Sequence, residues 1–128
     1  MSPPPPPGED SFGPWGNFGV RRPLRFLAHK LGLDEKQVVE LAKILDELKT
    51  ERAQAAVDER RTLADFADAF TSDQFDPAKA ASARERRADA AKRLSEKVVG
   101  ALEKIHALLT PEQRSRLAHF IRTGVLSI

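Results

Sequence analysis

Two copies of one five-residue pattern decide the fold of this chain: Leu33-Asp34-Glu35-Lys36-Gln37 and Leu109-Thr110-Pro111-Glu112-Gln113. Each copy has an apolar residue, a helix N-cap residue, two further residues and a glutamine. This is a capping box, in which the cap side chain accepts from the backbone N–H three residues on and the glutamine reaches back to the cap N–H. Proline suits the first helical position of the second copy, where its missing N–H costs nothing. The pattern therefore predicts that one helix begins after residue 34 and another after residue 110.

Working outward from these two starts, apolar periodicity predicts an all-α fold with four helices, over residues 21–31, 34–70, 76–109 and 111–124. The two long helices should form a long antiparallel hairpin, whose bulky residues meet at one end. The short first and last helices should join that end. The opposite end should be a thin two-helix arm with Phe66, Phe70 and Phe75 at its tip. Because a two-helix arm leaves an apolar stripe uncovered, we expect a homodimer.

Residues 1–20 differ in composition from the rest, and we divide the chain into this tail and a helical domain over residues 21–128. Pro3–Pro7 favours polyproline II, and the whole tail is expected to be disordered. Its aromatic residues, Phe12, Trp15 and Phe18, leave a second interpretation open, an arm that touches clients or a second subunit. At the other end of the chain, the apolar residues 125–128 are expected to dock on the helices.

The two motifs resemble those of the Spy/CpxP family, small all-helical proteins that carry a pair of Leu-Thr-x-x-Gln motifs. The second copy matches at Leu109, Thr110 and Gln113, and the first at Leu33 and Gln37, with Asp34 in place of threonine. Aspartate caps a helix equally well. The resemblance covers about residues 21–123. It implies a dimeric cradle built from crossed hairpins and ATP-independent, chaperone-like binding of partly unfolded or partner proteins.

The residues that fit client binding are arginines set among alanines on the two long helices, which combine apolar stems with charged heads. The candidates for client contact are Arg52, Arg60, Arg61, Arg84, Arg87 and Arg93, and the same region holds Arg86 and Lys92. The alternative interpretation of these residues is an ordinary solvated helix face.

Another candidate function is a heavy-metal sensor or resistance domain, as in other members of the same superfamily. Its weak ligand candidates are His29, His106 and His119, which have no His-x-x-x-His spacing. Nucleic-acid binding is less favoured, because residues 34–70 carry ten acidic and six basic side chains and residues 76–109 carry five and eight, so no surface of one sign is expected. We expect no enzyme activity and no cofactor, since the chain has no cysteine, no phosphate-binding loop and no nucleophile elbow.

No stretch of the sequence is typical of a membrane span. The N-terminus has prolines where the basic and apolar regions of a signal peptide would stand. The family resemblance implies a periplasmic protein if a signal peptide has been removed, and the cytoplasm is expected if Met1 is the native start.

Overall fold

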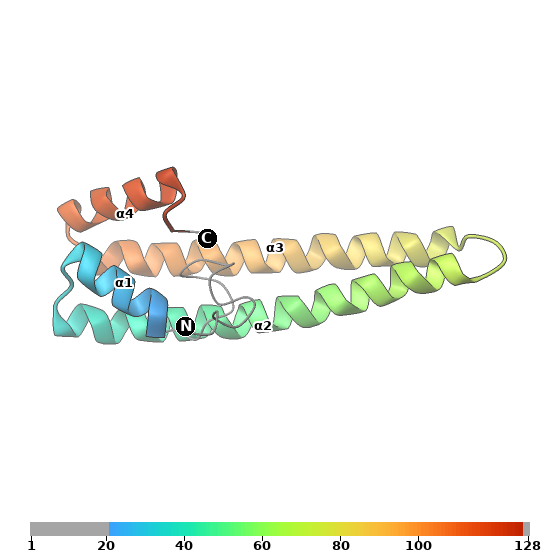
Figure 1. Cartoon of the computed structure of the whole chain (residues 1–128), viewed down its shortest axis with the longest axis horizontal. Helices are drawn as coiled ribbons and strands as arrows, with labels where there is room; N and C mark the ends of the chain where they lie inside the picture. The colour runs from blue at the N-terminus through green and yellow to red at the C-terminus, as the bar shows by residue number, and fades with distance from the viewer. Residues whose placement is uncertain (1–20, 127–128) are drawn as a thin grey trace, which may run out of the picture. The chain divides into compact units, whose positions relative to one another are not determined.

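The computed structural model of this chain describes residues 21–126, with side chains from Pro23 onward. It contains four helices, which Figure 1 labels α1 (Arg21–Leu31), α2 (Glu35–Thr71), α3 (Pro77–Leu108) and α4 (Pro111–Thr123). No strand occurs within this described range. The expected all-α, four-helix fold is confirmed. The expectations for residues 1–20 and for residues 127–128 lie outside the described residues.

The chain divides into two compact units, one made of the residues up to Lys49 together with those from Ala101, and the other of Thr50–Gly100. We refer to them as unit 1 and unit 2. α1, α4 and one end each of α2 and α3 lie in unit 1, while unit 2 contains the remainder of α2 and α3. Each unit is described separately below.

Unit 1 has a core of large aliphatic side chains. Its buried apolar residues are Leu27, Leu31, Leu41, Ile44, Leu45, Leu48, Ile105, Leu109, Leu117 and Leu126. They come from all four helices, from the α3–α4 turn at Leu109 and from the segment after α4 at Leu126. Burying one leucine contributes about 1.5–3 kcal/mol relative to leaving it exposed, so this unit carries most of the hydrophobic stabilisation. α1 also packs on α4 through the rings of Phe26 and Phe120, whose centroids are 5.8 Å apart.

Two glycines end helices of unit 1 in the left-handed conformation that residues with a Cβ disfavour. Gly32 has φ +63 and follows α1, where the N–H of Leu33 donates to the carbonyl of Ala28 at 3.0 Å. Gly124 has φ +78 and follows α4. Beyond it, the N–H of Leu126 donates to the carbonyl of Phe120 at 3.1 Å, and the Leu126 side chain is buried. The C-terminal segment therefore docks through Leu126, whereas Val125 is exposed.

Unit 2 has no comparable core. Its fully buried residues are the small Thr62, Ala69 and Ala83, and we call this line of contact the seam. The hydroxyl of Thr62 is satisfied within its own helix, since it donates to the carbonyl of Asp58 at 3.0 Å. Several larger apolar side chains of the unit are exposed, with 53% of Leu63, 81% of Phe70 and 59% of Phe75 accessible.

None of the helices in residues 21–126 combines the length and the apolar character needed to cross a membrane.

Candidate functional site

The two family motifs form the capping boxes that the sequence predicts. In the first, the N–H of Gln37 donates to Asp34 Oδ1 at 2.8 Å and the N–H of Asp34 donates to Gln37 Oε1 at 3.0 Å. In the second, the N–H of Gln113 donates to Thr110 Oγ1 at 3.3 Å and the N–H of Thr110 donates to Gln113 Oε1 at 3.0 Å. Asp34 therefore makes the same bond as Thr110. Its negative charge is also favourable beside the first turn of a helix.

The two glutamines of the motifs are bonded to each other across unit 1. Gln37 Nε2 donates to Gln113 Oε1 at 2.8 Å, and Gln113 Nε2 donates to Gln37 Oε1 at 3.3 Å. We call this reciprocal amide pair the glutamine clasp. The side chain of Gln37 is 9% exposed, so most of its polar atoms depend on protein partners.

Each clasp amide also caps the end of the helix that precedes the other motif. Gln37 Nε2 donates to the carbonyl of Leu108, the last residue of α3, at 3.0 Å. Gln113 Nε2 lies 3.3 Å from the carbonyls of Leu31 and Gly32, at the end of α1. Carbonyls in the last turn of a helix have no partner within the helix. The glutamine of each motif therefore caps two helix ends, the start of its own helix and the end of another.

Two arginines of α4 extend this arrangement. Arg114 Nε donates to the carbonyl of His106 at 2.9 Å, and Arg116 Nη1 donates to the carbonyl of Lys30 at 3.0 Å. Cations are favourable at the negative ends of helices. The motif site of unit 1 is thus a dense set of helix caps, and its bonds explain a structural role for the motif.

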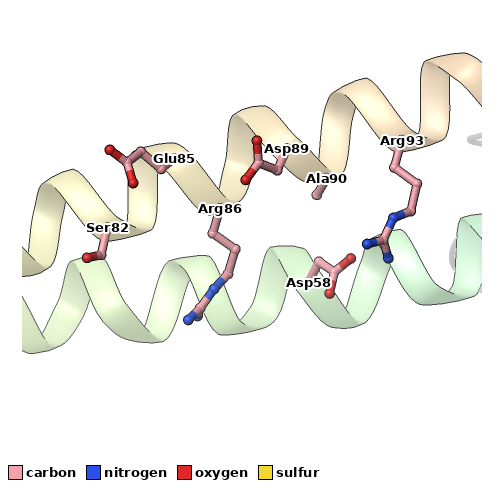
Figure 2. A pocket seen from close by; sticks show the side chains of 7 residues that line it. All are labelled: Asp58, Ser82, Glu85, Arg86, Asp89, Ala90 and Arg93. Carbon is pink, nitrogen blue, oxygen red and sulfur yellow. The ribbon is translucent and has the colours of Figure 1, made fainter.

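Unit 2 has two different faces, one on each side of the seam. Two ion pairs join its α2 and α3 segments, Asp68–Lys79 at 3.7 Å and Asp65–Arg86 at 2.6 Å. The higher-numbered residue of α2 pairs with the lower-numbered residue of α3, so the two segments run antiparallel. These pairs lie on one side of the seam, which we call the polar face. Figure 2 shows the same side closer to the middle of the unit, with Asp58 projecting from α2 and Arg93 from α3.

A shallow hollow of about 360 Å³ lies on the polar face. Its lining residues, labelled in Figure 2, are Asp58, Ser82, Glu85, Arg86, Asp89, Ala90 and Arg93. Three carboxylates and two guanidinium groups share this small open surface. Such a mixture attracts neither cations nor anions strongly, and Ala90 is the one apolar side chain among these lining residues.

The other side of the seam combines arginine with apolar side chains. Arg87 Nη2 pairs with Glu59 Oε1 at 2.6 Å, and the Arg87 guanidinium lies 5.3 Å from the centre of the Phe66 ring. Helical spacing of three and four residues places further side chains on this side of each helix. We define the Arg/apolar face by Arg52, Ala56, Glu59, Leu63, Phe66 and Phe70 of α2 and by Arg84, Arg87, Ala88 and Ala91 of α3.

Charge on the Arg/apolar face is predominantly positive. Glu59 is its one acidic residue, and Arg87 neutralises it. Arg84 is exposed and has no ion-pair partner among residues 23–126. Arg52 is half-buried, its Nε makes no hydrogen bond with the described part of the chain, and burial lowers the pKa of its guanidinium. The face therefore presents unpaired cationic groups beside uncovered apolar side chains.

The six arginines considered for client contact are distributed over different sides of unit 2. Arg52, Arg84 and Arg87 share the Arg/apolar face. Arg93 lines the hollow of the polar face, and Arg61 lies on the polar side of α2, one turn from Asp58 and Asp65. Arg60 is exposed on the side of α2 that points away from the seam.

The histidines considered as metal ligands, His29, His106 and His119, are all exposed. Residues 23–126 contain no group of three or more histidine, aspartate or glutamate side chains that could hold a metal ion. His119 instead lies beside the ring of Phe120, with the centroids 6.2 Å apart.

Comparison with known proteins agrees with the motif site. A family model described as LTXXQ motif family protein matches residues 20–120, a span that includes both motifs and both faces of unit 2. No curated protein and no solved structure matches the chain. The family match covers most of the sequence, and the chain therefore belongs to the LTXXQ motif family, whose members are Spy/CpxP-like.

Proposed function

We propose that this protein binds partly unfolded proteins without ATP, in the manner of a chaperone, and that its Arg/apolar face makes the contact. The observation that carries this proposal is the exposure of Leu63 and Phe70 on the same face as Arg84, which lacks an ion-pair partner within residues 23–126. Partly unfolded chains expose apolar side chains and backbone carbonyls. Leucine and phenylalanine offer contact to the first, and guanidinium groups donate hydrogen bonds to the second.

The strength of such contact is low, which suits a binder that must release its clients unaided. Covering the exposed part of Leu63 contributes about 1 kcal/mol and covering Phe70 about 2 kcal/mol, on the scale for apolar side chains. A total of about 3 kcal/mol is smaller than the roughly 4–15 kcal/mol that association itself costs, so this burial alone gives little affinity. One face therefore holds a client weakly, and two faces in a homodimer, which we also propose, would multiply the affinity.

Small side chains on the same face favour contact with many different clients. The small side chains of Ala56, Ala88 and Ala91 leave the surface shallow between the larger side chains. A shallow surface accepts bound segments of different shapes. Surfaces that bind many partners use adaptable contacts of this kind. Membership of the LTXXQ motif family supports the proposal and suggests a periplasmic protein.

The test is the aggregation of a chemically unfolded protein, followed by light scattering, without ATP. We expect suppression near stoichiometric amounts of the wild type, and a marked loss of suppression when Leu63→Ser and Arg84→Glu are combined. The matched control is Arg61→Glu, which reverses the charge of another exposed arginine of unit 2 but lies on the polar face. Circular dichroism establishes that each variant keeps its helicity.

Two results would contradict the proposal. One is the absence of any suppression at large excess of the wild type. The other is an equal loss of suppression in Arg61→Glu and in the double variant, because general loss of positive charge would then explain the effect and the Arg/apolar face would not.

A further inference from the structure

Unit 1 carries its charge unevenly. Its segments of α2 and α3 hold five acidic and four basic residues, whereas α1 from Pro23 onward and α4 together hold five cationic residues and one acidic residue. The two short helices lie against each other, since the rings of Phe26 and Phe120 are 5.8 Å apart and Arg116 Nη1 donates to the carbonyl of Lys30 at 3.0 Å. Their positive charge is therefore collected on one part of the unit.

Most of these cationic side chains are exposed to solvent. We define the basic face by the four exposed ones, Arg25 and Lys30 of α1 and Arg116 and Arg122 of α4. The fifth, Arg114, is half-buried and donates to the carbonyl of His106, so it is not included. Glu112 is the one acidic residue on this side, and it lies one turn from Arg116. The basic face thus has three positive charges in excess.

The charge of the basic face is not compensated within the described part of the chain. None of its four side chains forms an ion pair within residues 23–126, whereas Lys104 on α3 pairs with Glu47 at 3.0 Å. Lys30 and Arg122 stand in the last turns of their helices. The negative end of a helix offsets only about half a charge. Helix capping therefore leaves most of the positive charge of this face unused.

We propose that the basic face binds the surface of an anionic lipid bilayer, through the phosphate groups of its lipids. Clusters of four or more lysines and arginines on a surface helix are typical of such binding. Arg116 donates one N–H to the carbonyl of Lys30, which holds its guanidinium in place and leaves its remaining N–H groups available for phosphate. The rings of Phe26 and Phe120 are half-buried between the helices and add apolar contact at the depth of the headgroups.

The breadth of the basic face favours a bilayer over a nucleic acid. The face extends over two neighbouring helices, each about 10 Å wide, and so it measures about 20 Å across. The major groove of DNA is about 12 Å wide and admits one helix. The exposed residues of α1 and α4 that the structure describes include no asparagine or glutamine, the side chains that read adenine. A planar array of phosphates requires neither a narrow surface nor contacts with bases.

The expected strength follows from the number of charges. Each lysine or arginine held near an anionic surface strengthens binding about fivefold. The three charges in excess therefore give roughly a hundredfold preference for an anionic over a neutral bilayer. Such attraction acts over about 8 Å at physiological salt and weakens as salt is raised. This binding uses unit 1 alone and does not depend on the chaperone function proposed for unit 2.

The test is cosedimentation of the full chain with lipid vesicles at low ionic strength. One set of vesicles is phosphatidylcholine alone, and the other contains about one third phosphatidylglycerol. We expect binding to the anionic vesicles to be roughly a hundredfold stronger and to fall when salt is added. Combining Arg25→Gln, Lys30→Gln and Arg122→Gln should weaken it about a hundredfold. None of these three side chains makes a hydrogen bond within residues 23–126, so we expect the variant to keep its helicity in circular dichroism.

The matched control removes the same charge from the rest of unit 1. It combines Lys36→Gln, Lys43→Gln and Lys104→Gln, three exposed lysines of α2 and α3. We expect the control to bind anionic vesicles within about twofold of the wild type, because its lysines lie outside the basic face. Circular dichroism of the control should match that of the wild type.

Four outcomes would overturn the proposal. The first is no binding of the wild type to anionic vesicles, and the second is equal binding to both kinds of vesicle. The third is an equal loss in the control and in the variant of the basic face, because net charge alone would then explain the binding. The fourth is a DNA duplex that binds more tightly than the anionic vesicles at the same salt concentration and loses this affinity in the same variant, which would assign the face to nucleic acid.

Discussion

Replacing Gln37 by alanine removes one half of the glutamine clasp, and it is the sharpest test of how unit 1 is held together. The amide nitrogen of Gln37 donates to Gln113 Oε1 at 2.8 Å and to the carbonyl of Leu108 at 3.0 Å. Its oxygen accepts from the N–H of Asp34 at 3.0 Å and from Gln113 Nε2 at 3.3 Å. The substitution removes all four bonds. Since the site is 9% exposed, water replaces these bonds only in part.

The expected cost follows from the number of bonds and from their exposure. A typical intramolecular hydrogen bond contributes about 1 kcal/mol net, and an abandoned partner that stays buried costs more. The Asp34 N–H belongs to an exposed residue and regains water, and Gln113 Nε2 keeps the carbonyls of Leu31 and Gly32. We therefore count the two bonds of the amide nitrogen in full and the two bonds of the oxygen in part. We therefore expect Gln37→Ala to lower the free energy of unfolding by about 2–3 kcal/mol. For a chain of this size that corresponds to a fall in Tm of about 10 °C.

The assay is thermal and urea unfolding of the full chain, followed by circular dichroism. Gln54→Ala is the matched control, because Gln54 is a glutamine of the same helix whose amide donates to Asp58 at 3.2 Å on the exposed surface. Its effect should stay within about 0.5 kcal/mol. A double-mutant cycle with Gln113→Ala adds a second criterion. Because the two side chains share their bonds, the double variant should cost about 1 kcal/mol less than the sum of the single variants.

The reasoning fails if Gln37→Ala is no more destabilising than Gln54→Ala. It also fails if the two clasp substitutions are additive, because additivity would mean that the amides do not depend on each other. A loss confined to the capping box would be recognised by comparison with Asp34→Ala, for which only the cap is removed, at a cost of about 1 kcal/mol.

Three further predictions concern other parts of the chain. Thr110→Ala should lower the free energy of unfolding by about 1 kcal/mol, because it removes the side-chain cap of α4, and an unchanged Tm would argue against that role. Ala83→Leu should cost about 1–3 kcal/mol in urea unfolding, since Ala83 is fully buried in the seam and has no room for a larger side chain, whereas Ala88→Leu on the exposed surface of the same helix should be nearly neutral. Arg52→Met should leave the Tm unchanged or raise it, because it removes a buried Nε that lacks a partner among the described residues, and a large fall in Tm would show that Arg52 is an essential support.

The helix starts were predictable from sequence, but the clasp was not. A capping box accounts for the oxygen of each glutamine and says nothing about its NH₂ group. The capping box therefore gives no partner to the NH₂ groups of Gln37 and Gln113. The NH₂ group of Gln37 donates to Leu108, 71 residues away in the chain, and that of Gln113 donates to Leu31, 82 residues away. No local pattern predicts such pairings. The equal position of the two glutamines in matching motifs was the available signal for a symmetric contact.

The arginines of unit 2 show a different limit of the sequence analysis. Grouping them by composition treated neighbouring arginines as one surface, although consecutive residues of a helix point about 100° apart. Arg86 accordingly pairs with Asp65 on the polar face, and Arg87 pairs with Glu59 on the Arg/apolar face. Helical phase alone would have separated these two. The identity of their acidic partners required the register between α2 and α3, which depends on the packing of the seam.

The position of the large apolar side chains in unit 2 is difficult to explain by stability. A hydrophobic side chain stabilises a fold in proportion to the surface that it buries, so Leu63 and Phe70 contribute little where they stand. The seam beside them is made of alanine and threonine, and Thr62, the neighbour of Leu63 in sequence, is fully buried there. Unit 1, with its leucine core and its clasp, shows that this chain does build a conventional core elsewhere. The client contact that we propose for the Arg/apolar face would account for the exposed side chains, and a seam of small residues lets two helices support that face without burying it.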